Sequence, residues 1–173
     1  MSIKSKITVL TLLMSAVTYG AFAQTTKKSP DVAAIIRQFH SNYSNGEVEK
    51  NGALVDENVI IDVNGGAANK LNGETFKGRE AFVAFLKRDK LMFADGKITH
   101  HQMIASGNMA AVRFTMEGTH TGPIHTPDGI LQPTGRKIRL EATEFATFDD
   151  TGKLLHVHTL YNSIGLLMQL TAK

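Results

Sequence analysis

Apolar and polar residues alternate with a period of two through much of the second half of the chain. Three segments share this pattern: 110–117, 140–148 and 153–161. In the first of them Val112, Phe114 and Met116 fall on one side, and charged or hydroxyl side chains fall on the other. This period is typical of strands with one buried face. The pattern therefore predicts three strands, followed by a closing C-terminal segment at 165–170.

In the first half of the chain, apolar residues recur at helical spacing instead. Ser29, Pro30 and Asp31 are typical of a helix start, with Ser29 as the capping residue and Pro30 at the first helical position. An apolar stripe follows: Val32, Ile35, Ile36, Phe39 and Tyr43. Further elements are predicted in this order: a short helix at 47–54, a strand at 59–61, a helix opening at Gly78-Arg79-Glu80, and a strand at 98–104.

The order of these elements predicts the fold class. Helices are grouped ahead of four consecutive strands, and strands joined by tight turns pair antiparallel. We therefore expect an α+β fold in which the N-terminal helices pack on one face of a curved antiparallel sheet.

The N-terminus has the features of a secretory signal peptide. Lys4 and Lys6 precede a mostly apolar run at 7–17, and Ala21-Phe22-Ala23 is a small-x-small cleavage site. We expect residues 1–23 to be removed after Ala23, 24–29 to form a flexible leader, and 30–173 to form one domain. The apolar run is short for a membrane span, so a periplasmic or secreted protein with no membrane attachment after cleavage is expected.

Composition and charge exclude several kinds of function. The formal charge of +3 falls to +1 without Lys4 and Lys6, and no basic patch with interleaved aromatic residues is present. Nucleic acid is therefore not expected as a partner. The chain contains no cysteine, so no disulfide can form. Neither a nucleophile elbow nor a phosphate-binding loop occurs.

Four motifs in the second half carry a family resemblance. They are Gly118-Thr119-His120-Thr121-Gly122, Pro133-Thr134-Gly135-Arg136, Asp150-Thr151-Gly152-Lys153 and Gly165-Leu166-Leu167-Met168-Gln169-Leu170. In order and spacing they resemble the SnoaL-like polyketide cyclases, or ester cyclases, of the nuclear transport factor 2-like superfamily. The resemblance implies a cone-shaped curved sheet around an internal pocket for a small apolar molecule, no cofactor, and often a homodimer. Characterised relatives close a ring by an intramolecular aldol reaction.

One departure from the family pattern bears on activity. The last strand of characterised cyclases carries an Asp that acts as the acid–base group, and Thr159 stands at that position in this chain. A threonine does not titrate in the useful range. The resemblance leaves Glu144 or His158 to take over the role.

Glu144 is the candidate general base. It is in phase with Leu140, Ala142, Ala146 and Phe148, on the apolar face of its strand. A carboxylate in such a place is desolvated, which favours its neutral form and suits it to proton transfer. The alternative is a bulge or a shift in strand phase that would leave Glu144 in solvent.

Two histidines are further candidates for proton transfer or polarisation. His120 shares the phase of Phe114 and Met116 and is expected at the mouth of the pocket, or else as a histidine bonded within the base of a loop. His158 lies two residues after His156, either as part of the site or on an exposed polar face. With no acidic partner at a recognisable spacing, no metal site is expected.

The substrate-contacting residues expected from strand phase and from the resemblance are Phe114, Met116, Thr159, Tyr161 and Asn162. The 122–133 loop is either a lid or a plain surface excursion. The face holding Glu141, Thr143, Phe145 and Thr147 is the expected contact surface of a homodimer.

Three functions fit these observations. The first is a cofactor-free lyase or isomerase, similar to the cyclases, acting on a small apolar carbonyl compound through Glu144, His120 and His158. The second is a binding protein that uses the same pocket without catalysis. The third is a protein-interaction domain with the exposed sheet face as its functional surface.

Overall fold

A computed structural model describes residues 29–69, 72–126 and 129–172 of the chain. The predicted signal peptide and residues 24–28 of the leader lie outside these ranges. The elements in chain order are α1 (Val32–Ser44), η1 (Val48–Leu54), β1 (Val55–Val63), η2 (Gly66–Ala68), β2 (Glu74–Lys77), α2 (Arg79–Met92), β3 (Lys97–Ser106), β4 (Met109–Thr119), β5 (Ile124–Thr126), β6 (Gly129–Leu131), β7 (Lys137–Phe148), β8 (Leu154–Tyr161) and α3 (Ser163–Thr171).

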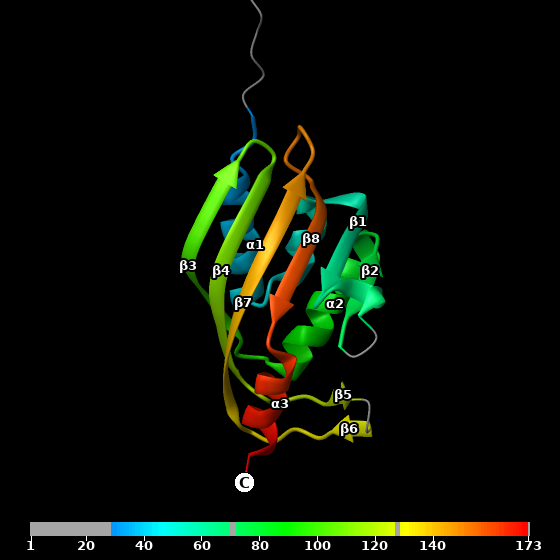
Figure 1. Ribbon diagram of the computed structural model, residues 1–173, viewed down its shortest axis with the longest axis vertical. Helices are drawn as coiled ribbons and strands as arrows, with labels where there is room; N and C mark the ends of the chain where they lie inside the picture. The colour runs from blue at the N-terminus through cyan, green and yellow to red at the C-terminus, as the bar shows by residue number, and fades with distance from the viewer. Residues whose placement is uncertain (1–28, 70–71, 127–128, 173) are drawn as a thin grey trace, which may run out of the picture.

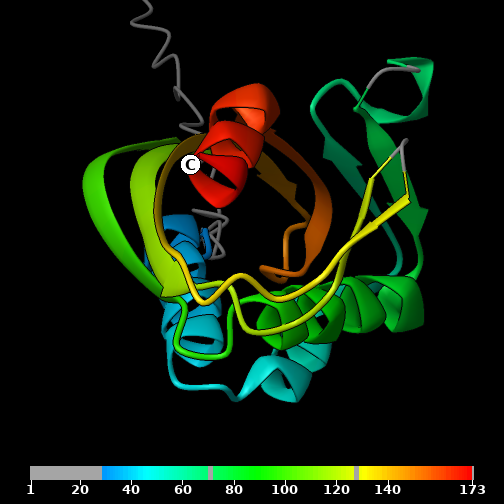
Figure 2. The ribbon, with the colours of Figure 1, turned by 90° about the horizontal axis from the view of Figure 1, so that it is seen from below.

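The main structure is a curved six-stranded sheet in the order β2-β1-β8-β7-β4-β3 (Figure 1). Neighbouring strands are antiparallel except β1 and β8, which run parallel. Viewed from below, the long strands form an arc, and α1, η1 and α2 lie across its open side (Figure 2). The predicted α+β class, with helices on one face of a curved sheet, is confirmed.

Helix α1 begins later than predicted. It starts at Val32, and its capping residue is Asp31, whose carboxylate accepts a hydrogen bond from the Ala34 amide at 2.9 Å. The prediction of Ser29 as the cap is therefore wrong. The physical reason is that Asp caps a helix as well as Ser does, and it stands directly ahead of the apolar stripe.

Other features were not predicted from the sequence. The two-stranded β5–β6 sheet is formed from three-residue strands, which are too short for a periodicity to appear. β2 has four residues and is equally short. The C-terminal segment is a helix, α3, that begins after Asn162.

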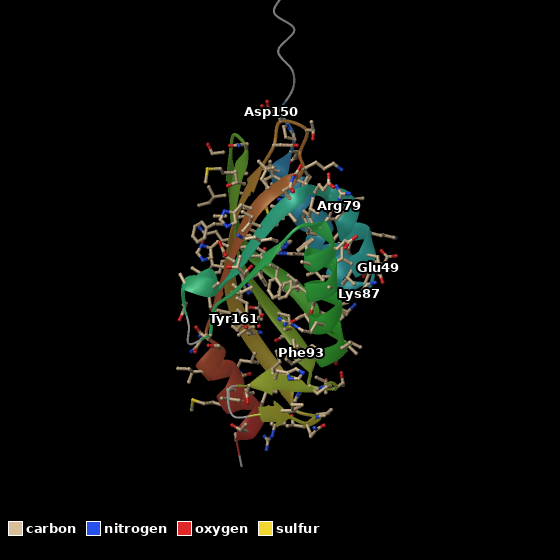
Figure 3. The ribbon with its side chains drawn as sticks, turned by 90° about the vertical axis from the view of Figure 1, so that its right-hand side faces the viewer. Glu49, Arg79, Lys87, Phe93, Asp150 and Tyr161 are labelled. Carbon is tan, nitrogen blue, oxygen red and sulfur yellow. The ribbon has the colours of Figure 1, made fainter. Side chains whose placement is uncertain are left out.

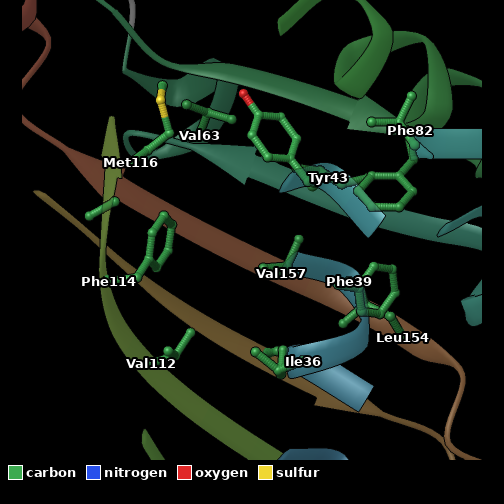
Figure 4. Packing of buried hydrophobic residues seen from close by; sticks show 14 of the residues in the cluster. Ile36, Phe39, Tyr43, Val63, Phe82, Val112, Phe114, Met116, Leu154 and Val157 are labelled. Atoms are coloured by element: carbon green, nitrogen blue, oxygen red, sulfur yellow. The ribbon is translucent and has the colours of Figure 1, made fainter. Parts of the chain in front are cut away.

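The core lies between the inner face of the sheet and the helices (Figure 4). Ile36 and Phe39 from α1 pack there against inward-facing residues of the strands, such as Val112 and Val157. An ion pair between Glu49 of η1 and Lys87 of α2, at 3.1 Å, joins these two helices on the outside (Figure 3). Among the described residues, no helix has the length and apolar character needed to cross a membrane.

Candidate functional site

A cavity of about 140 Å³ lies between the inner face of the sheet and the helices. Most of its lining is apolar, which follows from the alternation of the strands and the stripe on α1. The ionisable or hydrogen-bonding side chains that line it are His40, Tyr43, Asn51, Asp89, Glu144, Thr159 and Tyr161. The pocket implied by the sequence is therefore present, and it contains two carboxyl groups.

Glu144 faces this cavity. Strand β7 pairs without interruption from Met109↔Thr147 to Thr119↔Lys137 on β4, so Glu144 keeps the phase of its apolar neighbours. Its side chain is only 17% exposed and lines the cavity. The position is the one the strand phase predicts, and a bulge that would turn Glu144 to solvent is not found; its role as a base stays a prediction.

Glu144 belongs to a chain of hydrogen-bonded side chains that crosses from sheet to helix and back. Its Oε1 accepts a hydrogen bond from the Thr159 hydroxyl at 3.2 Å, and its Oε2 lies 3.0 Å from Nε2 of His40. Nδ1 of His40 lies 2.6 Å from Nε2 of His100. Four residues from α1, β3, β7 and β8 are thus linked at one place.

Local structure explains how the two histidines reach Glu144. His40 follows Ile36 by one helical turn and points into the protein with it, and it is 8% exposed. An irregularity in the β3–β4 pairing falls between His100 and Gln102. His100 lies just before it, in regular pairing with the inward-facing Phe114, and so it faces His40. His101 contacts the Thr115 hydroxyl at 2.5 Å.

The surroundings of His100 favour its neutral form. Burial lowers the pKa of His100 below its ordinary value of 6.5, and the neighbouring His40 and Arg37 lower it further. Across the 2.6 Å contact between the two rings, one nitrogen donates a hydrogen bond and the other accepts it.

In this chain of hydrogen bonds, Glu144 keeps capacity for a further hydrogen bond and His40 does not. Both ring nitrogens of His40 are engaged, one by Glu144 and the other by His100. Each carboxylate oxygen of Glu144 has a second lone pair beyond the one engaged by Thr159 or His40. His40 therefore orients the Glu144 side chain, whose oxygens keep hydrogen-bonding capacity for a further partner.

A second polar pair lies on the helical wall of the cavity. The Tyr43 hydroxyl of α1 donates a hydrogen bond to Oδ2 of Asp89 on α2. Burial raises the pKa of Asp89, and it also raises that of Tyr43, with the nearby Asp89 adding to the effect.

Four of the five predicted substrate-contacting residues line the cavity: Phe114, Met116, Thr159 and Tyr161. Asn162 does not. Its side chain caps α3 by accepting the Gly165 amide at 2.8 Å, and it lines a separate open groove with Leu160. The reason is that Asn162 directly follows Tyr161, which faces the cavity, and its side chain is used to cap α3.

His120 and His158 lie away from the cavity. His120 is fully buried at the base of the 122–133 loop, where its Nδ1 accepts the Thr134 amide at 3.2 Å, so the pocket-mouth position is not found. His158 follows the inward-facing Val157 and lies on the outer face of β8, where its ring stacks on that of His156. Among the described residues neither is hydrogen-bonded to Glu144, and the part of both histidines in the reaction stays a prediction.

Sequence analysis missed His40, His100, Tyr43 as a polar group, and Asp89. His40 and Asp89 were open to detection, because each follows an apolar residue of its helix by one turn, Ile36 and Phe85 respectively. His100 was also open to detection, because it follows Ile98 by two residues on the same face of a regular stretch of β3.

Two further predictions concern metal and the loop. Among the described residues, no group of three or more His, Cys, Asp or Glu side chains is arranged to hold a metal ion. The 122–133 loop forms the β5–β6 hairpin, whose Ile124 and Leu131 pack against the core. No described residue of this hairpin lines the cavity.

Comparisons with known proteins identify the family. Residues 33–170 match the SnoaL-like polyketide cyclase family, and the chain belongs to it. A comparison with curated proteins found no match.

Solved structures of low sequence identity share the fold. A protein of Jannaschia sp. CCS1 assigned as a SnoaL-like polyketide cyclase superposes with a TM-score of 0.70 at 12% identity, covering 82% of this chain and 92% of that one. A protein assigned as a polyketide cyclase from Xanthomonas campestris gives 0.67 at 20%, covering 81% and 96%. IdmH from Streptomyces antibioticus, also assigned as a polyketide cyclase, gives 0.66 at 21%, covering 82% and 99%. At these identities the likeness supports the fold alone.

Proposed function

We propose that this protein is a cofactor-free acid–base enzyme, a lyase or isomerase of the cyclase type, that acts on a small apolar carbonyl compound. The observation that carries the proposal is the Glu144 carboxylate in an apolar cavity, held by His40 at 3.0 Å and by Thr159 at 3.2 Å. A desolvated, oriented carboxylate is suited to removing a proton from a carbon next to a carbonyl group.

The position of Glu144 compensates for the departure at Thr159. Glu144 and Thr159 are direct partners across the β7–β8 pair, and their side chains are hydrogen-bonded. A carboxylate on β7 therefore occupies the space next to the position where the family's acid–base Asp is expected on β8. The acid–base role moves to the adjacent strand, and Thr159 becomes a hydrogen-bond donor to it.

The size of the cavity limits the substrate. An engineered apolar cavity of about 150 Å³ in another protein binds benzene. The cavity here, of about 140 Å³, is therefore matched to a compound with one small ring or a short chain.

Glu144→Gln tests the base. The change keeps the shape and the hydrogen-bonding capacity of the side chain but removes its basicity. The measurement is deuterium exchange, by NMR in D₂O, at the carbons next to the carbonyl group of cyclohexanone and cyclopentanone. The parent protein should accelerate the exchange, and the variant should lose about a hundredfold or more of that acceleration.

Glu141→Gln is the matched control. Glu141 lies on the same strand with its side chain 62% exposed near Arg113, so its change should leave exchange unaltered. Equal rates for Glu144→Gln and the parent would contradict the proposal. Tight binding of either ketone with no exchange would instead identify a binding protein.

Export and self-association complete the proposal. We propose that the chain is exported to the periplasm or the medium, supported by the charged and apolar segments ahead of Gln24. We also propose a homodimer formed through the outer face of the sheet, supported by two large apolar side chains exposed there, Phe145 and Leu160.

A further inference from the structure

The pair formed by Asp89 and Tyr43 has no part in the proton-abstracting chain around Glu144. Both residues line the cavity, from α2 and α1, whereas Glu144 lines it from the sheet. The Tyr43 ring is 5% exposed, and its hydroxyl points toward the side of Val63, away from Phe39 (Figure 4). The cavity therefore has two carboxyl groups on different walls, Asp89 and Glu144, and apolar side chains cover most of the rest.

The surroundings of Asp89 favour its neutral form. None of the ion pairs among the described residues includes Asp89, although Arg88 and Lys90 are its chain neighbours. Arg88 pairs with Glu74 at 2.6 Å, and the Lys90 ammonium lies 4.9 Å from the centre of the Tyr43 ring. Burial raises the pKa of the Asp89 carboxyl, so it keeps its proton to a higher pH than an ordinary aspartate.

Tyr161 adds a second donor at the same cavity (Figure 3). Burial raises the pKa of its hydroxyl, so the hydroxyl stays protonated. Within the described part of the chain, no hydrogen bond engages this hydroxyl. Donors in a water-poor cavity stabilise an oxygen atom on which negative charge develops.

We propose that Asp89, oriented by Tyr43, is a further catalytic residue that binds the carbonyl oxygen of the substrate and gives it a proton. This inference rests on the proposed function. It names the substrate class as a ketone or aldehyde whose oxygen lies at α2 and whose acidic C–H bond lies at Glu144. Tyr43 is a positioning residue, since its hydroxyl donates to Asp89.

Enolisation of the carbonyl compound transfers two protons. The Glu144 carboxylate takes the proton from the carbon next to the carbonyl group, and the C–H electrons form the C=C bond of an enol. The electrons of the C=O π bond move to oxygen, which takes the proton of Asp89. Glu144 is left neutral and Asp89 ionised, and return of the two protons, at the same carbon or at another one, restores both groups.

Binding of phenol and of toluene tests the oxygen site without relying on catalysis. The two ligands share a ring and differ in the hydroxyl group. The variant is Tyr43→Phe with Asp89→Leu, because replacing both partners of a buried hydrogen bond by apolar groups of similar shape leaves none unsatisfied. By calorimetry, the phenol-to-toluene affinity ratio should fall about tenfold relative to the parent.

Two control variants define the site. Glu80→Gln, on the exposed first turn of α2, should keep the ratio of the parent. Glu144→Gln should also keep it, because the phenol oxygen is expected at Asp89. An unchanged ratio in the double variant, or a ratio lost in Glu144→Gln, would overturn the inference.

A crystal structure of the parent protein with phenol gives a test that needs no variant to fold. A phenol oxygen within hydrogen-bond distance of Asp89 is expected, and one bonded to Glu144 would overturn the inference. The exchange assay separates the two proposals. If ketone exchange requires Glu144 but the phenol-to-toluene affinity ratio of the double variant equals that of the parent, the oxygen site alone is refuted. If that ratio falls but the parent shows no ketone exchange, the proposed reaction alone is refuted.

Discussion

At the scale of single residues, the site depends on ionisable side chains that are hydrogen-bonded to one another beside a small apolar cavity. Glu144, His40 and His100 are linked by contacts of 3.0 and 2.6 Å. Because the pKa of His100 is lowered in the folded protein, its protonation is linked to the stability of the fold.

His100 provides a prediction about acid stability. Its pKa in the folded protein is below 6.5, so the unfolded chain binds a proton there first as the pH falls. The stability that the neutral form contributes is present above pH 6.5 and is lost as the pH falls through the lower, folded-state pKa. The charged or titratable groups around it are His40, Arg37, Glu144 and His101.

His100→Asn should therefore show a shallower loss of unfolding free energy between about pH 7 and pH 5, measured by urea denaturation. His125→Asn, at an exposed position on the β5–β6 hairpin, is the control and should keep the parent slope. A slope in His100→Asn as steep as in the parent would show that His100 does not contribute.

At the scale of elements, alternation was the most informative signal in the sequence. It located β4, β7 and β8, and it placed Glu144 on the inner face because β7 is regular through that position. It did not support Asn162, which was expected from the family resemblance and lies one residue past β8. It does place His100 on the inner face with Ile98, although alternation alone gave no reason to select that histidine.

The sequence predicted the helices but not the polar side chains that they contribute to the site. The stripe on α1 was found as a packing surface, yet His40 lies on that same stripe and bonds to Glu144. The pattern on α2 does not indicate that Asp89 has a partner, because that partner, Tyr43, lies on α1 and is distant in sequence. Contacts between elements are set by how the helices lie across the sheet, and periodicity along one element carries no information about that.

At the scale of the whole molecule, the outer face of the sheet predicts self-association. Phe145 is 50% exposed there, and Leu160 is 41% exposed. If this face forms a homodimer, Phe145→Asp should give a monomer in sedimentation velocity, because it would place a charge in an apolar contact. Ile130→Asp, at a similarly exposed apolar residue of the β5–β6 hairpin, should leave the dimer intact. A parent protein that sediments as a monomer would refute the proposed dimer.

The export proposal predicts the N-terminal residue of the mature protein. Cleavage after Ala23 would leave Gln24 as the first residue. Mass spectrometry of the protein recovered from its native compartment should find this N-terminus. A full-length cytoplasmic species beginning at Met1 would refute the export proposal.

The parallel pairing of β1 with β8 has a consequence for the order of events during synthesis. Val55–Val63 reaches its sheet partner only when Leu154–Tyr161 has left the ribosome, so β1 keeps an unpaired edge until that later segment has been made. Contacts this distant in sequence also slow folding, because closing a long loop costs entropy before the contact forms. We therefore expect the nascent chain to stay open while it is made, which is the state in which a polypeptide can be threaded through a translocation channel.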